Sequence, residues 1–466
     1  MQVVVSQHAS PPATNVTPGS VPYGADHHRV IGAVGATGMI VAAMIGSGIF
    51  ALTGQFGASV GTTTNVLAPW VIGGVLALCG GLALAELGAM IPCSGGSVEF
   101  ARRAFGSTVG YLVAMVTILS GYFLSIAAVA LLFAQYVDEL VPQDLSDHTI
   151  AVVTIVIAYL SQLPGLRVGY AFNTALSVLK IAFVAIFVVA GLLVPVGERR
   201  TAPPPTDAPS LFSPAVASAT LTVSFAYLGW STGADIAGDI RKPGRNIPRA
   251  IIASILLVFA LYLGVNLVYL RVIDPTAMLT AEGKELPAIG SVAARLLFGE
   301  SIGLVMTGVI ALLFFSTIVS GTITAARILE SMAASREIPA WTGVRRSDGV
   351  PARALLVTLI ASVIPLAIGS LDEIFGLLTV LVNIFSSLSV AAVIVLRRTM
   401  PDAPRPFRVP LYPFVPLLYL ALAGWSIIAS IQNGGWTSII ASACTVVGLL
   451  LLRPLLSPRD IAQKAL

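Results

Sequence analysis

The stretch Ile31–Leu52 reads IGAVGATGMIVAAMIGSGIFAL, and it decides what kind of protein this is. A helix that crosses a bilayer needs about 20 mostly apolar residues, and this stretch contains no charged side chain. Its middle holds Gly46-Ser47-Gly48, and two glycines around a serine weaken a helix and let its backbone unwind. Unwound backbone at membrane depth is tolerated only where it lines a cavity or is buried in protein. The stretch therefore predicts a membrane helix that is broken near its middle.

The composition of the whole chain also indicates a lipid environment. Of its 466 residues, 56% are hydrophobic and only 10% are charged, and the mean hydropathy is +0.92. A soluble domain is typically about one quarter charged, and a soluble fold of this length could not hide so much apolar surface. The net charge of +4 is small for this length and gives no sign of nucleic-acid binding.

Apolar runs long enough to cross a bilayer recur along the chain. They predict an all-α membrane protein with twelve transmembrane helices, at Ile31–Leu52, Val66–Met90, Gly110–Val137, Thr149–Leu163, Ala171–Val194, Ala215–Ile236, Ala250–Leu270, Ile302–Leu329, Ala354–Ile368, Ile374–Leu396, Leu411–Ile431 and Trp436–Leu452.

The basic residues predict the orientation, because lysine and arginine accumulate in cytoplasmic loops. With the N-terminus inside, 19 of the 26 basic residues fall in inner segments and 5 in outer ones, while Lys180 and Arg327 lie within helices. Shifting the helix count by one would scramble this split. We expect a multi-pass protein of the cell membrane with both termini cytoplasmic, a disordered tail at 1–29 and a second tail at 455–466.

The sixth apolar run contains a second break. Residues 225–233 read FAYLGWSTG, with glycine among aromatic and hydroxyl residues near mid-span. The first and sixth helices hold corresponding positions in two blocks of five helices, 30–196 and 215–398, and residues 409–454 hold the last two helices. Paired helices interrupted by glycine are the best sequence pointer to the binding site of a transporter.

Such paired breaks suit a zwitterionic ligand. The N-terminus of a half-helix offers N–H groups and a positive dipole end to a carboxylate, and unwound carbonyls can accept hydrogen bonds from an ammonium group. The alternative is that Gly46 and Gly48 only allow close helix packing, and the sequence leaves both interpretations open.

Lys180 is the one lysine deep in a predicted span. It lies about nine residues into the fifth helix, roughly 14 Å from the inner end at 1.5 Å per residue. An unpaired charge at that depth costs at least a few kcal/mol. We therefore expect Lys180 to face the protein interior, either neutral or bonded to carbonyls and hydroxyls. It could exchange protons there or serve only as a structural polar group.

Other charged residues lie nearer the inner ends of the helices. For Glu86 and Arg327 we expect helix-end packing or gating. Asp235 and Asp239 precede the basic segment 241–249, which leaves inner-gate ion pairs and a solvated helix end as alternatives.

The sequence contains no sign of an enzyme, a cofactor or a metal centre. A membrane enzyme would need a nucleophile with its base, or a metal cluster. All four histidines lie outside the predicted helices, and no HExxH or Gly-x-Ser-x-Gly motif occurs. The three cysteines, Cys79, Cys93 and Cys444, lack a metal-type spacing. No filter-forming segment of a channel is recognisable either.

Six motifs, in this order and topology, resemble the amino acid–polyamine–organocation (APC) superfamily of transporters, and in particular its amino acid permeases. They are Gly46-Ser47-Gly48-Ile49-Phe50, Ala85-Glu86-Leu87 with Ile91-Pro92 and Gly95-Gly96, Phe225-Ala226-Tyr227 with Gly229-Trp230, Lys242-Pro243 with Arg245 to Ile251, Ala326-Arg327 with Ile338-Pro339, and Arg405-Pro406-Phe407-Arg408-Val409-Pro410.

The resemblance implies a LeuT-type fold, in which two inverted repeats of five helices are followed by two extra helices. It implies an amino acid bound near the midplane between helices one, three, six, eight and ten. The substrate-binding positions carried over are Met44, Ile45, Gly46, Ser47, Gly48, Phe225, Ala226, Leu228 and Gly229.

Among these positions, the resemblance assigns the backbone N–H groups at Ser47 and Gly48 to the substrate carboxylate. It assigns the carbonyls of Met44, Phe225 and Leu228 to the ammonium group, and it makes Phe225 an aromatic gate.

The resemblance also implies how transport is driven. A lysine on the fifth helix fills the place of the sodium ion in sodium-coupled relatives, and Lys180 matches that position, with Ser316 and Ser320 beside it. This implies proton coupling or exchange, by symport or antiport. The sequence departs from the family pattern at Leu228, where many relatives are polar, and at Gly238 and Asp239, where the family has paired acids.

The substrate class follows from the charges that are missing. The mid-membrane parts of helices one, three, six, eight and ten contain no Asp or Glu, whereas a cationic substrate would need a carboxylate partner. We therefore expect neutral amino acids as substrates, with cationic amino acids or polyamines as the alternative and a non-transporting amino acid sensor as a second class. Polar groups for the pocket come from Asn383, Ser386 and Ser387, and four aromatic residues either line it or serve as packing and interface anchors: Trp230, Phe225, Phe385 and Tyr122.

Overall fold

The computed structural model describes residues 29–46, 48–93, 95–141, 145–163, 166–280, 283–286, 288–346, 349–432 and 436–456. For residues 166–177, 368, 455 and 456 it describes the backbone alone. The two predicted tails therefore lie almost entirely outside the described residues.

All regular elements among the described residues are helices, with three isolated β-bridges and no strand. The α-helices are α1 Ala33–Met44, α2 Gly48–Val60, α3 Thr63–Met90, α4 Gly96–Phe105, α5 Ser107–Ile118, α6 Ser125–Leu140, α7 Asp147–Ser161, α8 Leu166–Leu193, α9 Pro214–Ala226, α10 Thr232–Asp235, α11 Pro243–Val272, α12 Ile289–Phe298, α13 Glu300–Ala334, α14 Ala352–Ile368, α15 Leu371–Thr399, α16 Phe414–Gln432 and α17 Trp436–Leu456. A π-helical turn, η2 Leu119–Leu124, joins α5 to α6, and short 3-10 turns are η3 Ala237–Asp239, η4 Pro275–Ala277 and η5 Ala340–Gly343.

Seven of the described helical segments are long and apolar enough to cross a membrane, and the bent pair of α1 and α2 makes an eighth. The seven are α3, the continuous run from α5 to α6, α11, α13, α15, α16 and α17. The other predicted spans coincide with shorter apolar helices, namely α7, Val178–Leu193 of α8, α9 and α14. The chain is thus an all-helical protein with several membrane spans, while the count of twelve and the inverted repeat stay predictions.

Several helices begin where the sequence supplies a capping side chain. The hydroxyl of Thr62 accepts a hydrogen bond from the backbone N–H of Asn65 at the start of α3. At the start of α9 the hydroxyl of Ser213 accepts from the backbone N–H of Val216. Pro214 occupies the first helical position of α9, where an N–H group would have no partner within the helix. Ser370 and Glu373 form a capping box at α15. These caps satisfy N–H groups that would otherwise be unpaired at the edge of an apolar environment.

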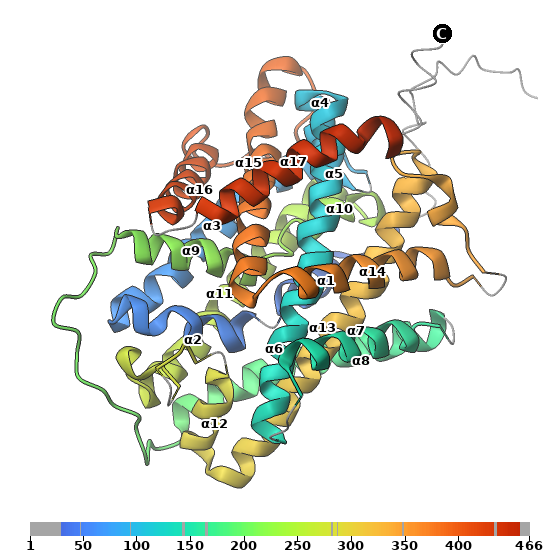
Figure 1. The fold of residues 1–466 in the computed structure, drawn as a ribbon. Coiled ribbons are helices and arrows are strands. Elements are labelled where there is room, and N and C mark those ends of the chain that lie inside the picture. The colour runs from blue at the N-terminus through green and yellow to red at the C-terminus, as the bar shows by residue number, and fades with distance from the viewer. Residues whose placement is uncertain are drawn as a thin grey trace, which may run out of the picture.

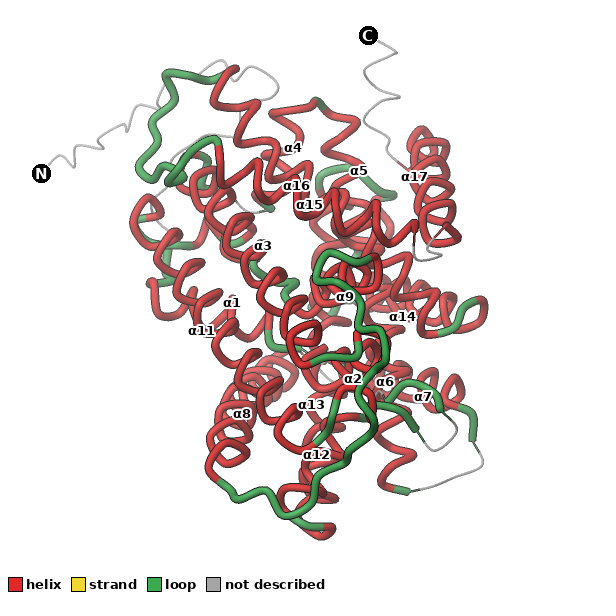
Figure 2. Tube along the Cα trace, turned by 90° about the vertical axis from the view of Figure 1, so that its left-hand side faces the viewer, coloured by secondary structure: helices red, strands yellow, loops and turns green. Residues whose placement is uncertain are grey.

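Two short helices fill connections that we expected to be loops, α4 after α3 and α12 before α13. They lie at opposite ends of the molecule (Figure 1). The Pro-rich segment 194–213 runs along the outside of the molecule from α8 to α9 (Figure 2).

Several ion pairs between distant parts of the described chain join segments that were predicted to share one side of the membrane. Arg102 pairs with Glu337 at the predicted inner end. Arg295 pairs with Glu139, and Arg199 pairs with Asp274 at 2.5 Å, at the predicted outer end. This agrees with the predicted alternation of the loops, whereas the assignment of the inner end to the cytoplasm stays a prediction.

Candidate functional site

The first helix is broken where its glycines predict. α1 ends at Met44 and α2 begins at Gly48, and the two axes differ by 42°. Ile45 and Gly46 are non-helical, although the N–H of Ile45 still donates to the carbonyl of Val41 at 2.8 Å. Ser47 lies outside the described residues. The start of α2 therefore points a helix N-terminus into the interior of the protein.

The second break follows the same plan. α9 ends at Ala226, residues 227–231 form turns, and α10 resumes at Thr232. Within this segment Gly229 has φ +107°, a conformation that side chains disfavour. A Cβ atom there would lie 2.7 Å from the carbonyl carbon of Ala43 and 2.8 Å from its oxygen. Only glycine lets the second break lie directly on the backbone that leads into the first.

The glycines of the first break have different roles. A Cβ atom on Gly48 would lie 3.0 Å from the Cβ of Ala226, so this glycine allows α2 to pack closely against the end of α9. A Cβ atom on Gly46 would meet only the carbonyl oxygen of Met44, at 3.9 Å. The packing interpretation thus holds at Gly48, while Gly46 lies in unwound backbone with space beside it.

A tyrosine from a neighbouring helix holds the two breaks together. The hydroxyl of Tyr262, on α11, lies 2.7 Å from the carbonyl oxygen of Met44 and 2.9 Å from that of Ala226. The N–H of Gly46 donates to the same hydroxyl. The side chain is fully buried. Because a hydroxyl carries one proton, only one of the two carbonyls can accept from it at a time.

The sequence analysis missed Tyr262. The signal that could have identified it is a tyrosine one turn before Asn266 in an otherwise apolar span, because buried polar groups in a membrane helix need partners.

A buried aromatic and polar layer supports this junction. The indole N–H of Trp70 donates to the hydroxyl of Thr53 at 3.1 Å, and that hydroxyl donates to the side-chain oxygen of Asn266 at 2.5 Å. The hydroxyl of Tyr227 donates to the carbonyl of Trp70 at 3.0 Å. The ring of Trp70 also packs edge-on against Tyr262 at 5.4 Å. This layer fixes α2, α3 and α11 behind the breaks.

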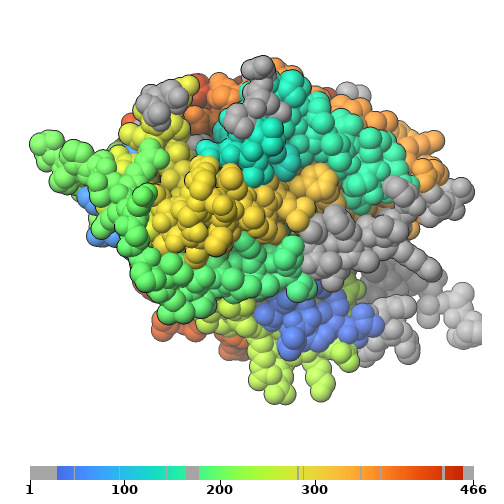
Figure 3. Space-filling view, turned by 90° about the horizontal axis from the view of Figure 1, so that it is seen from below, coloured from blue at the N-terminus to red at the C-terminus, as the bar shows by residue number. Residues whose placement is uncertain are grey.

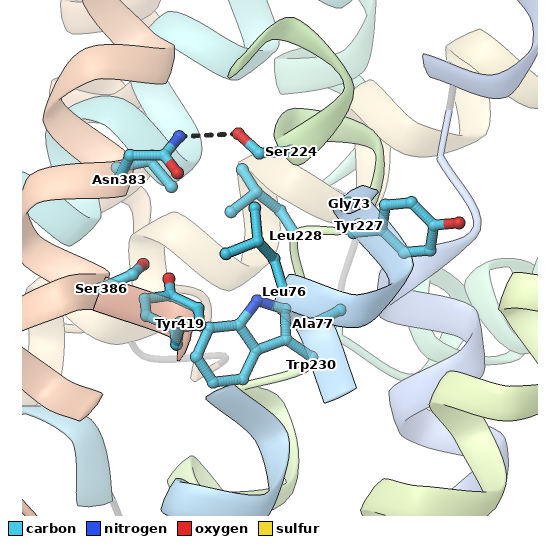
Figure 4. A pocket seen from close by; sticks show the side chains of 11 residues that line it. Gly73, Leu76, Ala77, Ser224, Tyr227, Leu228, Trp230, Asn383, Ser386 and Tyr419 are labelled. Atoms are coloured by element: carbon cyan, nitrogen blue, oxygen red, sulfur yellow. Dashed lines mark hydrogen bonds between the residues drawn. The ribbon is translucent and has the colours of Figure 1, made fainter. Parts of the chain in front are cut away.

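A small cavity of about 20 Å³ lies beside the second break (Figure 4). That volume is large enough for a water molecule. Asn383 donates to the hydroxyl of Ser224 at 2.6 Å across the cavity, while the hydroxyl of Tyr227 points away from it (Figure 4). The lining contains no charged side chain and consists of Gly73, Leu76, Ala77, Ser224, Tyr227, Leu228, Trp230, Val382, Asn383, Ser386 and Tyr419.

The residues expected around the pocket are thus only partly brought together. Of the four aromatic candidates, Trp230 lines the cavity. The predicted gate residue, Phe225, is half-buried and packs edge-on against Phe375 of α15, with ring centroids 5.1 Å apart. Phe385 is buried in the core and does not line this cavity.

Lys180 lies inside the protein, as its position predicts. Its side chain is 4% exposed, and its Nζ donates to the hydroxyl of Thr317, on α13, at 3.0 Å. Ser316 and Ser320, the expected neighbours, are on the same helix, but the partner is Thr317. The hydroxyl of Ser316 is buried and has no hydrogen-bond partner among the described residues.

Glu86 belongs to a buried charged cluster at the inner end. Its carboxylate accepts from Arg397 at 2.8 and 2.5 Å and from the N–H of Val409 at 2.6 Å, and Arg405 lies 3.4 Å away. These contacts tie α3 to the end of α15 and to the loop that follows, so helix-end packing is the role that the structure supports for Glu86.

For Asp235 the structure supports neither alternative from the sequence analysis, an inner-gate ion pair or a solvated helix end. Its carboxylate accepts from the N–H and hydroxyl of Ser97 at 3.1 and 2.7 Å, at the start of α4. It forms no ion pair with residues 241–249. Across the described part of the chain, no group of three or more His, Cys, Asp or Glu side chains could hold a metal ion.

The sequence profile of the family described as amino acid permease matches residues 31–450, which is most of the chain. The chain belongs to the amino acid permease family. This confirms the resemblance to the APC superfamily, and it makes the chain a member of a family of transporters rather than of enzymes.

Curated relatives of this permease cover most of its length. The serine/threonine exchanger SteT of Bacillus subtilis is 26% identical over 423 residues, which is 89% of this chain and 95% of SteT. The human large neutral amino acids transporter small subunit 2 is 28% identical over 84% of this chain and 74% of its own length. The human b(0,+)-type amino acid transporter 1 is 28% identical over 91% of this chain and 87% of its own length.

Proposed function

We propose that this permease is a secondary active transporter of neutral amino acids, driven by protons or by exchange and not by sodium. The observation that carries the proposal is the contact between the two breaks, where Gly229 of the second break lies on the backbone of Ala43 at the end of α1 and Tyr262 bonds to both breaks. Unwound backbone inside a membrane protein is kept where it serves a cavity or a ligand.

The two ends of an amino acid would find different partners there. α2 begins at Gly48, whose N–H group and helix dipole would face the carboxylate, while Ser47, which lies outside the described residues, stays the second predicted donor. Carbonyls of Met44, Phe225 and Leu228 would accept from the ammonium group. Met44 also accepts from Tyr262, but a carbonyl oxygen has a second lone pair for a ligand.

The uncharged lining of the adjacent cavity supports a neutral side chain. A cationic side chain moved into this environment would need a carboxylate partner, and none lines the cavity. Two of the relatives carry names that specify serine/threonine and large neutral amino acids.

Lys180 supports proton coupling or exchange. Its ammonium group would occupy the space that a sodium ion fills in sodium-coupled transporters of the same superfamily, and its partner is a hydroxyl group. A lysine that binds and releases its proton there would link substrate binding to the proton gradient.

The test is uptake by the full chain reconstituted in proteoliposomes, with radiolabelled neutral and cationic amino acids and polyamines, and with proton and sodium gradients set separately. We expect uptake of neutral amino acids that ignores sodium and responds to pH or to amino acid inside the vesicle. Sodium-driven uptake would overturn the assignment of Lys180. Ligand binding without uptake would favour a sensor.

The binding position has its own test. Gly48→Leu should abolish ligand-induced thermal stabilisation, because a larger side chain meets Ala226 and fills the ligand space. Gly424→Leu is the matched control, since a Cβ atom there meets nothing within 4 Å. Equal stabilisation in both variants would remove the site assignment.

A further inference from the structure

A group of unpaired cations surrounds the start of α11. Arg241, Lys242, Arg245 and Arg249 are all exposed, and none of their side chains makes a hydrogen bond or ion pair within the described residues. The nearest acid in the sequence, Asp239, is also exposed and forms no ion pair with them within that part of the chain. A neighbouring loop adds Arg408, which is exposed as well.

The neighbouring loop lies against this helix start. A Cβ atom on Gly244 would be 2.5 Å from the Cβ of Pro406. Arg408, two residues beyond, therefore extends the same surface. Figure 3 is seen from the opposite end, where a yellow-green segment lies beside the blue N-terminal segment, in agreement with the packing of α11 against α1.

The same face of α11 continues into lipid. Arg245, Arg249, Ala253, Leu256 and Ala260 follow one another at steps of three or four residues, and all five are exposed. This spacing places them on one face of a helix. The guanidinium groups thus lie at the end of an apolar stripe that faces the lipid tails.

The position of these cations along α11 places them at the level of the lipid headgroups. Arg249 lies seven residues before Leu256, which is about 10 Å along the helix. The headgroup layer lies just outside a hydrocarbon core about 30 Å thick. Long arginine side chains can extend further toward that layer.

We propose that the cations at the start of α11, with Arg408, form a binding surface for anionic phospholipid headgroups of the adjacent leaflet. Juxtamembrane clusters of basic residues bind anionic lipids, and the uncapped N-terminus of α11 adds the positive end of a helix dipole. This surface does not depend on which substrate the protein carries.

Two other basic residues at this end, Arg345 and Arg353, differ because they are already engaged within the protein. Arg345 pairs with Glu330 at 2.6 Å, and Arg353 donates to the carbonyl of Trp341 at 3.5 Å. Arg345→Gln combined with Arg353→Gln therefore removes two charges from the same end without touching the proposed surface.

The test titrates dioctanoyl phosphatidylglycerol, or the matched phosphatidylcholine, into the purified full chain in neutral detergent and follows the thermal unfolding midpoint. Phosphatidylglycerol should raise the midpoint, and the concentration for half the effect should rise about fivefold for each charge removed. The double variant Arg245→Gln with Arg249→Gln should thus need about 25-fold more phosphatidylglycerol for half the effect. The charge-preserving pair Arg245→Lys with Arg249→Lys should keep the response, as should the control pair.

Three outcomes would overturn the proposal. The first is an equal response of the glutamine pair and the wild type. The second is an equal loss in the control pair. The third is full stabilisation by glycerol 3-phosphate at the same concentration, which would make the ligand a soluble phosphate and not a lipid. If the glutamine pair does not fold, the titration of the wild type is repeated at high salt. Stabilisation by phosphatidylglycerol that high salt leaves unchanged is not electrostatic and would overturn the proposal.

Discussion

Lys180 and Glu86 are both buried charged side chains on membrane helices, and their surroundings differ completely. Glu86 is fully buried, and it accepts from Arg397 and from the N–H of Val409, with Arg405 close by. Lys180 has three N–H donors, and among the described residues its only partner is the neutral hydroxyl of Thr317.

The difference separates a charged group with a structural role, Glu86, from one that we propose takes part in transport, Lys180. The partners of the Glu86 carboxylate are cations and an N–H donor, and they join three segments of the chain. The Lys180 ammonium group has one neutral partner and no counter-ion among the residues that the structure describes. The predictions below test this contrast.

Glu86→Ala should have the largest effect, on stability. Removing one member of a buried ion pair typically costs about 3–5 kcal/mol, because the remaining charge is left unpaired. The measurement is the free energy of unfolding from a denaturant titration in mixed micelles. Glu330→Ala, which removes the partner of the exposed Arg345, is the control and should cost no more than about 1 kcal/mol. Equal losses would show that Glu86 does not have the structural role given to it.

Lys180→Ala should act on transport and leave the fold intact. A hydrogen bond from a charged group contributes about 1.5–3 kcal/mol, so we expect uptake to fall about tenfold or more and to lose its pH dependence. Proteoliposome uptake at several pH values is the measurement. Leu179→Ala, at the adjacent exposed position of α8, is the control. Wild-type uptake and pH dependence in Lys180→Ala would contradict the role of Lys180.

Thr317→Val should give a smaller version of the same effect. It removes the one hydroxyl that bonds to Lys180 among the described residues but keeps the ammonium group, so we expect a loss below the about 1.5 kcal/mol at the lower end of the range for a hydrogen bond from a charged group. Uptake should therefore fall about fivefold, whereas Thr317→Ser should keep the wild-type rate. If Ser320→Ala matches the loss seen in Thr317→Val, the partner of Lys180 has been assigned to the wrong hydroxyl.

Glu285 provides the test with the smallest expected effect. Its charged neighbour is an acid, Asp372, whereas the charged neighbours of Glu86 are arginines. Glu285 lies in the segment before α12, where loss of hydration and the negative charge of Asp372 raise its pKa from 4.5 to about 7. A raised carboxyl pKa means that folding favours the protonated form, so stability is lost as pH rises from about 4.5 through about 7.

Glu285→Gln should therefore raise the thermal unfolding midpoint above pH 7 and leave it unchanged below pH 4.5. Asp372→Asn should give part of the same gain, because it removes one of the two causes of the shift. A gain that is independent of pH would mean that the substitution acts by another route.

The sequence predicted the features that depend on local chemistry. Gly46, Gly48 and Gly229 marked the two breaks, because glycine is the residue that unwound or crowded backbone requires. Lys180 was placed inside the protein because lipid excludes an unpaired charge. Both inferences need only the residue and its depth in an apolar run.

The sequence could not predict contacts that depend on how neighbouring helices are rotated. Ser316, Thr317 and Ser320 offer similar hydroxyls on one helix, and packing decides that Thr317 meets Lys180. Tyr262 reaches the breaks from a helix that looked like a plain span. The short helices α4 and α12 were missed because connections between spans carry no strong apolar pattern.

One backbone contact has a consequence for how the inner end can move. The N–H of Ile31 donates to the carbonyl of Asp239 at 3.0 Å, and the N–H of Arg241 donates to the carbonyl of Ile31 at 2.9 Å. The chain that enters α1 is thus joined to the chain that leaves α10. These two half-helices either travel as one rigid body when that end opens, or the opening must first break both bonds and adds their energy to its activation barrier.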